Sequence, residues 1–244
     1  MQAGRIALGG IAVVGLIGCD LSLSSYDEIY ARGAEQYVMC AQNIDSKSDF
    51  GIDDIDGALM RAKVDGTTLQ LYAHRPGATI EVSALEAVLA AANQRGTPFA
   101  TYEELSAGEV PGSLALAFDD HHLEAWMAIR PLLDRYHARV TFFISAYTRI
   151  TDEDRAAVRT LADDGHDIEF HSVGHLDAEA YSNEHGVDAY LADEILPALD
   201  AMRAAGYATT VFAYPFGTRN AATDAALAPY FSHIRAIRST CPHS

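Results

Sequence analysis

Basic residues are scarce in this chain: 17 lysines and arginines stand against 34 aspartates and glutamates, which gives a formal net charge of −17. A protein that binds nucleic acid or an anionic membrane surface needs positive charge to neutralise phosphate groups. The composition therefore argues against both kinds of partner. The excess of acidic residues by itself indicates little more than solubility.

Repeats, low-complexity blocks and interdomain linkers are also missing from the sequence. The chain has 244 residues, of which 49% are hydrophobic, so it can form a full hydrophobic core. We therefore expect one folded domain over residues 36–244. Two segments of a different character precede it.

The longest apolar stretch, IALGGIAVVGLIG, follows Arg5 and is too short to span a bilayer comfortably. A basic start, an apolar run and small residues at its end are typical of a secretory signal. The sequence LIGC, which ends at Cys19, resembles a bacterial lipobox, in which the signal is cut before an acylated cysteine. We predict a signal peptide over 1–18, a lipid anchor on Cys19 and a polar tether over 19–35, which would place the protein in the bacterial cell envelope. A buried strand or a plain signal peptide is the alternative.

Cysteine is rare, with three residues in the whole chain. If Cys19 carries the anchor, Cys40 and Cys241 remain. An even pair in an oxidising compartment permits a disulfide. Whether these two residues meet depends on the fold.

Short apolar runs alternate with amphipathic stretches from about residue 55 onward. The strand-like runs are Thr68–His74, Pro98–Thr101, Ser113–Phe118, Val140–Ser145, Asp167–Phe170 and Thr209–Ala213. The helix-like runs are Val82–Gln94, His122–Tyr136, Asp152–Asp163 and Val187–Ala205. This alternation predicts a parallel α/β architecture, and a (β/α) barrel is the natural solution for one domain of this length.

Carboxylates and imidazoles follow several of these strands. Asp119 and Asp120 come directly after one strand, His171 and His175 follow another, and His74 ends the run TLQLYAH. Catalytic groups of such barrels collect at the C-terminal ends of the strands. We therefore expect these side chains to meet at one rim.

The spacing of His171 and His175 predicts that both rings lie on one face of a helical turn. Two imidazoles and one carboxylate oxygen leave an open position on a tetrahedral zinc ion, as a catalytic site requires. Of the adjacent Asp119 and Asp120, one can bind the metal and the other can take a proton from water. A metal lowers the pKa of that water toward about 7 and polarises a carbonyl group. Either motif alone is as often structural, but their placement at one rim favours a site.

These motifs resemble those of the polysaccharide deacetylase family, carbohydrate esterase family 4: LALAFDDHH its first, DGHDIEFHSVGH its second and FAYPFG its third motif. The resemblance implies a distorted (β/α) barrel of roughly seven or eight strands. It implies that Asp119 is the general base and that Asp120, His171 and His175 bind a divalent metal, most commonly zinc. It also implies that the backbone N–H of Phe216 helps to hold the oxyanion.

The family's last motif, an apolar strand that ends in Leu-x-His, stands out of order. In the family it follows the third motif, whereas here LYAH, ending at His74, precedes the first. We infer a circular permutation, which proteins tolerate where the termini lie close together at the surface. His74 is then the general acid that protonates the leaving amine or alcohol. The permuted order also brings YVMCAQNID next to HIRAIRSTCPHS, and Cys40 and Cys241 can pair if their Cα atoms lie within about 7 Å.

Two positions depart from the family pattern, and one further segment matches it only loosely. His121 stands where the family has glycine, and could reach the metal or narrow the cleft. Ala213 replaces an arginine that normally contacts the base, so the tuning of Asp119 must come from elsewhere. The segment DSKSDF from Asp45 to Phe50 only loosely resembles the motif that orients the acid histidine, and we interpret it as a polar loop. Trp126 is interpreted as a core residue. The remaining histidines are interpreted as surface or structural residues: His122, His137, His166, His185, His233 and His243.

The leading hypothesis is metal-dependent removal of N- or O-linked acetyl groups from a polysaccharide outside the cytoplasm. The expected partners are that acetylated polysaccharide and a membrane, contacted through the anchor alone; no feature indicates an oligomeric state. One alternative is a hydrolase of another amide or ester. The other is a non-catalytic glycan-binding lipoprotein, which the missing arginine favours and the intact acid, base and ligands oppose.

Overall fold

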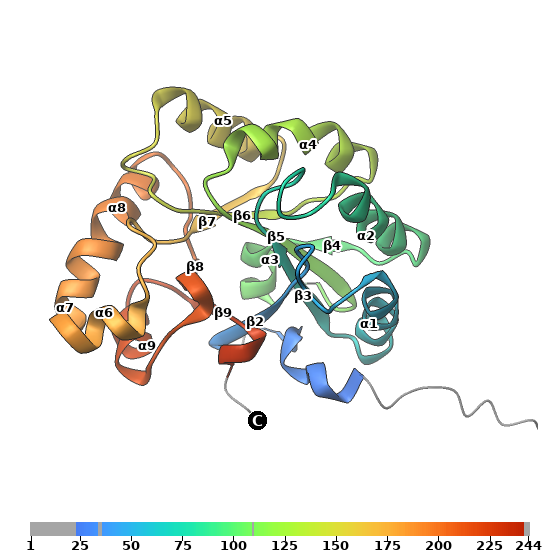
Figure 1. Cartoon of the computed structure of the whole chain (residues 1–244), viewed down its shortest axis with the longest axis horizontal. Helices are drawn as coiled ribbons and strands as arrows, with labels where there is room; N and C mark the ends of the chain where they lie inside the picture. Colours follow the sequence, from blue (N-terminus) through green and yellow to red (C-terminus); the bar gives the residue numbers. More distant parts are fainter. Residues whose placement is uncertain (1–22, 34–35, 109, 242–244) are drawn as a thin grey trace, which may run out of the picture.

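A closed barrel of seven parallel strands forms the centre of the molecule (Figure 1). The computed structural model describes residues 23–33, 36–108 and 110–241. The strands follow one another around the ring in chain order, and β9 pairs with β2 to close it. They are β2 (Val38–Asn43), β3 (Thr68–Ala73), β5 (Ser113–Asp120), β6 (Thr141–Ile144), β7 (Asp167–Phe170), β8 (Val211–Ala213) and β9 (His233–Ile237). The predicted (β/α) barrel is confirmed.

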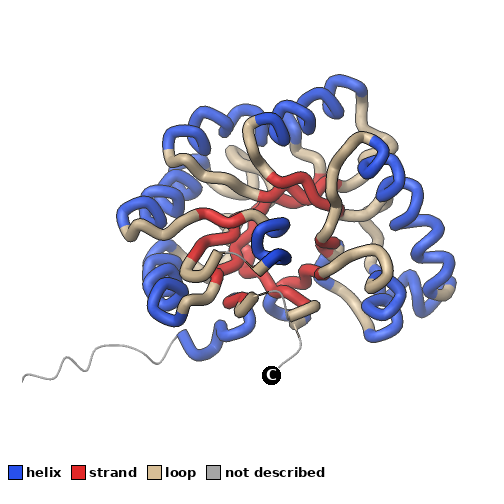
Figure 2. The backbone as a smooth tube through the Cα atoms, turned by 180° about the vertical axis from the view of Figure 1, so that it is seen from behind, coloured by secondary structure: helices blue, strands red, loops and turns tan. Residues whose placement is uncertain are grey.

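Helices surround the ring of strands on its outer side (Figures 1 and 2). They are α1 (Ile52–Asp65), α2 (Val82–Gln94), α4 (Leu123–Arg135), α5 (Asp152–Asp163), α6 (Ala178–His185), α7 (Val187–Tyr190), α8 (Leu196–Ala204) and α9 (Ala221–Leu227). Short elements complete the fold: η1 (Leu23–Ile29), β1 (Tyr30–Ala31), β4 (Phe99–Ala100), η3 (Pro215–Gly217) and η4 (Arg238–Thr240). Within the described ranges, none of the helices has the length and apolar character needed to cross a membrane.

Strand β5 shows how the barrel separates its two faces. Leu114, Leu116 and Phe118 pack in the outer core against the helices, because alternate side chains of a strand point to opposite faces. The inward positions carry the small residues Ala115 and Ala117. Asp119 is the next inward position, so the alternation of β5 points its carboxylate into the barrel near the rim.

The other end of the barrel is filled by α3 (Tyr102–Ala107). Tyr102 is fully buried in the inner cluster with Ala115 and Ala117, whose small side chains leave room for its ring. Its backbone N–H donates to Thr141 Oγ1 at 2.9 Å, at the first residue of β6. The helix therefore covers the end at which the strands begin, and the opposite rim remains for the site.

The two ends of the described domain meet at the pairing of β2 with β9. Cys40 lies opposite Ala236 in this parallel pair, and Cys40 and Cys241 form a disulfide with their Cα atoms 6.1 Å apart. The predicted proximity of the chain ends is therefore observed. This arrangement is the one that a circular permutation requires, and the permutation itself stays a prediction.

The predicted tether needs a correction, because part of 19–35 belongs to the fold. Ile29, Tyr30 and Ala31 are buried, and β1 pairs antiparallel with β3. The predicted signal peptide over 1–18 and the anchor Cys19 lie outside the described residues. The sequence reading also missed β2, β9 and α1, whose runs mix polar and apolar residues.

The helix predicted over Val187–Ala205 is interrupted. The structure divides it into α7, a π-helical turn at Leu191–Ile195, and α8. Pro197 lies in the first turn of α8. It has no backbone N–H, and within a continuous α-helix its ring would clash with the preceding turn. The wider π turn accommodates the proline.

Candidate active site

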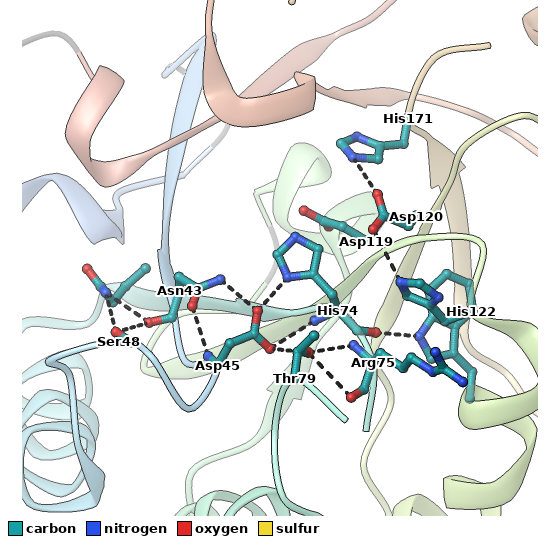
Figure 3. A network of polar contacts seen from close by, with 12 residues as sticks. Asn43, Asp45, Ser48, His74, Arg75, Thr79, Asp119, Asp120, His122 and His171 are labelled. Atoms are coloured by element: carbon teal, nitrogen blue, oxygen red, sulfur yellow. Dashed lines mark hydrogen bonds and ion pairs between the residues drawn. The ribbon is translucent and has the colours of Figure 1, made fainter. Parts of the chain in front are cut away.

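Three predicted metal ligands, Asp120, His171 and His175, converge at the C-terminal rim of the barrel. Figure 3 shows Asp120 and His171 facing each other. Asp120 Oδ1 lies 3.6 Å from His171 Nε2 and 3.2 Å from His175 Nε2. One ligand atom from each residue falls within 4.8 Å of the others, close enough for a single ion to contact all three. One carboxylate and two imidazoles form a donor set that suits zinc and leaves a position open. The residues present therefore fit a divalent metal.

The surroundings of His171 prepare it for that role. Its Nδ1–H donates to the carbonyl oxygen of Ala213 at 2.7 Å, which leaves Nε2 free to bind a metal. Complete burial lowers the pKa of His171 to about 4, and the nearby charge of Arg235 acts in the same direction. The imidazole is therefore neutral at pH 7, which is the form that binds metals.

The segment that carries both histidines is a loop, so the expected helical turn is wrong. No helix is assigned between His171 and His175, and Ser172 and His175 have φ angles of 69° and 57°. The hydroxyl of Ser172 accepts the backbone N–H of His175 at 3.1 Å. The two rings meet because this left-handed loop turns His175 back toward His171, with ring centroids 5.1 Å apart.

The second oxygen of Asp120 faces His122, which the sequence analysis interpreted as a surface or structural residue. His122 Nε2 lies 3.4 Å from Asp120 Oδ2. Burial opposes ionisation of this carboxyl, but hydrogen bonds from His122 and His175 and the charge of His74 outweigh it and hold the pKa of Asp120 well below its usual range. His121 does not join the metal ligands; its Nδ1 lies 2.9 Å from Ser145 Oγ.

Asp119, the predicted base, pairs with a residue that the sequence reading did not select. Arg235 Nη2 lies 2.5 Å from Asp119 Oδ2, and both side chains are buried. The guanidinium stacks between the rings of Tyr72 and Phe143 at 4.7 and 5.0 Å. Asp119 Oδ1 is buried and accepts no hydrogen bond from any described residue, so it is free to receive one from a substrate or water.

Arg235 contacts Asp119 in place of the arginine that the family pattern has at the position of Ala213. In the parallel pair of β8 and β9, Ala213 lies directly opposite Arg235. The guanidinium therefore enters the barrel from the neighbouring strand, at the same level. An arginine inside the apolar run HIRAI was the one sequence signal for it.

His74 and Asp45 form the other side of the site. His74 Nδ1–H donates to Asp45 Oδ2 at 2.5 Å, and Thr79 Oγ1 donates to Asp45 Oδ1 at 2.7 Å (Figure 3). Burial favours the neutral imidazole, but the hydrogen bond to Asp45 and the charges of Asp119, Asp45 and Asp120 outweigh it and raise the pKa of His74. The segment DSKSDF is a polar loop, as interpreted, but its first residue, Asp45, also orients the histidine, which that interpretation did not include.

Trp126 behaves as predicted. It is fully buried in the core, and its indole N–H donates to the carbonyl oxygen of His74 at 2.8 Å. This bond fixes the backbone from which the His74 imidazole extends.

Phe216 follows β8 beside the metal ligands. It lies in the left-handed region at φ 58°, which is uncommon for an aromatic residue and typical of strained functional positions. Its ring is 59% exposed and packs edge-on against His175, with centroids 4.7 Å apart. The next residue must be glycine, because a Cβ on Gly217 would lie 2.5 Å from Ile237 Cγ1 and 2.8 Å from its backbone nitrogen.

Comparisons with known proteins agree with this site. A family model described as polysaccharide deacetylase matches residues 108–230, which contain Asp119, Asp120, His171, His175 and Phe216. The solved structure of IcaB from Ammonifex degensii superposes with a TM-score of 0.57 at 20% identity and covers 70% of this chain and 84% of that one. The deacetylase domain of BpsB from Bordetella bronchiseptica has a TM-score of 0.54 at 14% identity, with 86% and 88% covered.

These two likenesses show the fold, a closed barrel with surrounding helices. No curated protein sequence matches the chain. The family model covers more than half of the chain and includes its metal-ligand motifs. The chain therefore belongs to the polysaccharide deacetylase family and is a deacetylase, an enzyme of the hydrolase class.

Proposed function

We propose that this protein removes acetyl groups from an extracytoplasmic polysaccharide in a metal-dependent reaction. The observation that carries the proposal is that three groups of side chains with different chemical roles converge at one rim of the barrel. They are the metal-ligand set of Asp120, His171 and His175, the carboxylate of Asp119 with one free oxygen, and the imidazole of His74 with a raised pKa.

Asp120, His171 and His175 would hold a divalent metal, zinc in our proposal. The bound metal would supply Lewis acidity toward the acetyl carbonyl and make a water molecule more acidic. Asp119 Oδ1 accepts the proton of the attacking water as a C–O bond forms to the acetyl carbon. Arg235 holds Asp119 Oδ2 and thereby fixes the direction of the carboxylate, with Oδ1 left to accept the proton. The backbone N–H of Phe216 donates to the oxygen on which negative charge develops.

His74 completes the reaction on the opposite side. As the bond from the acetyl carbon to the sugar nitrogen or oxygen breaks, His74 donates its Nε2 proton to that leaving atom, and acetate and a free amine or hydroxyl result. The hydrogen bond from Nδ1 to Asp45 fixes the ring and stabilises its protonated form. An acid is needed because neither an amide anion nor an alkoxide leaves readily at neutral pH.

We further propose that residues 1–18 are a signal peptide, that Cys19 carries a lipid anchor in the cell envelope, and that the domain is circularly permuted. Two observations support this. Asp45 and His74, which follow β2 and β3, and Arg235 on β9 lie outside the matched segment 108–230, on both sides of it in sequence. The Cys40–Cys241 disulfide suits an oxidising compartment.

The test is acetate release by the zinc-loaded full-length protein, with Asp119→Asn as the blank. The panel is chitooligosaccharides, peptidoglycan and acetylated xylan. Release from one of them, absent in the blank, supports the proposal and identifies the substrate class. Metal binding without release from any member would favour the non-catalytic glycan-binding alternative, although Arg235 removes the main argument for it by contacting Asp119.

A further inference from the structure

A buried glutamate outside the metal-ligand set holds the loop that carries His175. Glu194 lies in the π turn between α7 and α8 and is only 3% exposed. Neither the match to the family motifs nor the proposed reaction uses it. Its side chain faces the loop from His171 to Leu176.

Glu194 binds that loop at three backbone groups. Its Oε2 accepts the N–H of Gly174 at 2.8 Å and the N–H of Leu176 at 3.4 Å, which are the residues on either side of His175. Its backbone carbonyl accepts the N–H of Val173 at 3.0 Å. Hydrogen bonds from N–H groups to an ionised carboxylate are among the stronger ones in proteins. One residue therefore fixes the backbone on both sides of a metal ligand.

The glycine of the motif HSVGH is explained by the same contact. A Cβ on Gly174 would lie 2.4 Å from Glu194 Oε1 and 3.2 Å from its Cδ. The φ angle of Gly174 is not in the left-handed region, so the backbone conformation alone does not require glycine here. A side chain here would have to displace the carboxylate of Glu194 from its present position.

The π turn accounts for the position of Glu194. The N–H of Leu196 bonds to the carbonyl oxygen of Leu191, five residues back, and Pro197 follows directly. Such single π turns occur frequently at functional sites. In this chain the turn delivers both the carboxylate and the carbonyl of Glu194 to the loop.

We propose that Glu194 is a positioning residue that sets the direction of the His175 imidazole and thereby the metal affinity of the site. The inference rests on the proposed function in one respect, that the site of Asp120, His171 and His175 binds a divalent metal. Partners that orient metal ligands typically change metal affinity by roughly 10–100-fold when they are removed.

The test measures zinc affinity of the full-length protein by competition with a chromophoric chelator, together with the visible absorption of the cobalt-loaded protein. Glu194→Ala should weaken zinc binding by roughly 10–100-fold and change the cobalt spectrum. Glu194→Gln should retain most of the affinity, because its amide oxygen can take the place of Oε2. Asp193→Ala is the matched control: Asp193 lies on the same turn but accepts from Tyr181 Oη at 2.6 Å, and its loss should leave zinc affinity unchanged.

Gly174→Ala provides a second route that does not remove Glu194. The added methyl group should displace the carboxylate and weaken zinc binding in the wild-type background, with little further loss in Glu194→Ala, because both changes break the same contact. Additive losses in the double variant would overturn this inference but not the proposed function. So would wild-type zinc affinity and an unchanged cobalt spectrum in folded Glu194→Ala and Gly174→Ala. A wild-type protein that binds no divalent metal would overturn the proposed function together with it.

Discussion

The two sides of the site are built in different ways. The metal side comes from β5 to β8 and their loops, all within residues 108–230, and consists of Asp119, Asp120, His171, His175 and Phe216. The acid side comes from β2, β3 and β9, outside that segment, and consists of Asp45, His74 and Arg235. The metal side depends on left-handed backbone at Asp120, Ser172, His175 and Phe216, whereas the acid side depends on paired charges.

This difference shows what each side needs from the fold. The motifs of the metal side are continuous in sequence, although Arg235 and Glu194 support them from elsewhere in the fold. The acid side exists only once β9 has paired with β2 and β3 with β5, because its members come from opposite ends of the chain. Changes on the two sides should therefore have separable effects.

The largest effect is expected for Asp119→Asn. Loss of the proposed general base should lower kcat by roughly 10²–10⁴-fold, while zinc affinity stays near the wild-type value. The asparagine oxygen still accepts from Arg235, so the fold should be retained. Acetate release and metal content measured on the same sample check this. A variant that keeps wild-type turnover would show that Asp119 is not the base.

Loss of the disulfide should lower the stability of the fold without affecting the metal side. Cys40 and Cys241 lie 201 positions apart in the sequence, and their disulfide links β2 to the segment that follows β9. Replacing both with alanine should lower the free energy of unfolding by about 2–5 kcal/mol. Denaturant unfolding measures this loss.

At a temperature well below the unfolding transition, the same double variant should keep its zinc affinity, because the metal side lies elsewhere in the ring. Reduction of the wild-type protein is the control and should lower stability in the same way. A loss of zinc affinity without a loss of stability would contradict the separation of the two sides.

A smaller effect, confined to the acid side, is expected for Asp45→Asn. The carboxylate of Asp45 favours the protonated form of His74, so replacing it with an amide should lower the pKa of His74. Because the reaction needs the protonated form, activity falls as the pH rises through this pKa. The alkaline limb of the kcat/KM profile should therefore move to lower pH, with roughly a tenfold loss at neutral pH.

Asp49→Asn is the matched control, since Asp49 is exposed in the same segment and should leave the profile unchanged. An unshifted alkaline limb in Asp45→Asn would show that the contact between Asp45 and His74 has no role in the proton transfer.

Local patterns in the sequence predicted much of the barrel. The bounds of α2, α5 and β7 are those expected, because clear periodicity and helix ends mark them. Strands β2 and β9 were missed because YVMCAQN and HIRAI contain polar residues that are buried in the structure, among them Gln42 and Arg235. These two strands pair because the barrel closes, and no local sequence pattern predicts that closure.

The candidate site was predictable where a motif is continuous. Asp120, His171 and His175 do converge, but through left-handed turns rather than the helical turn that their spacing suggested. Arg235 and Glu194 were missed because each acts across the fold on a residue that is distant in sequence. A polar residue inside an apolar run was the only local signal for Arg235, and nothing in the sequence separated Glu194 from other glutamates on a helix.

The most direct test of the two-sided site compares His74→Gln with the wild type on two substrates. One is an N-acetylated glucosamine oligomer, whose amine is a poor leaving group, and the other is an activated aryl acetate, whose phenolate leaves without a proton. We predict that kcat/KM of the variant falls by roughly 10²–10⁴-fold on the oligomer and changes little on the aryl ester. Equal losses on both substrates would contradict the assignment of His74 as the acid, and with it the division of the site into a metal side and an acid side.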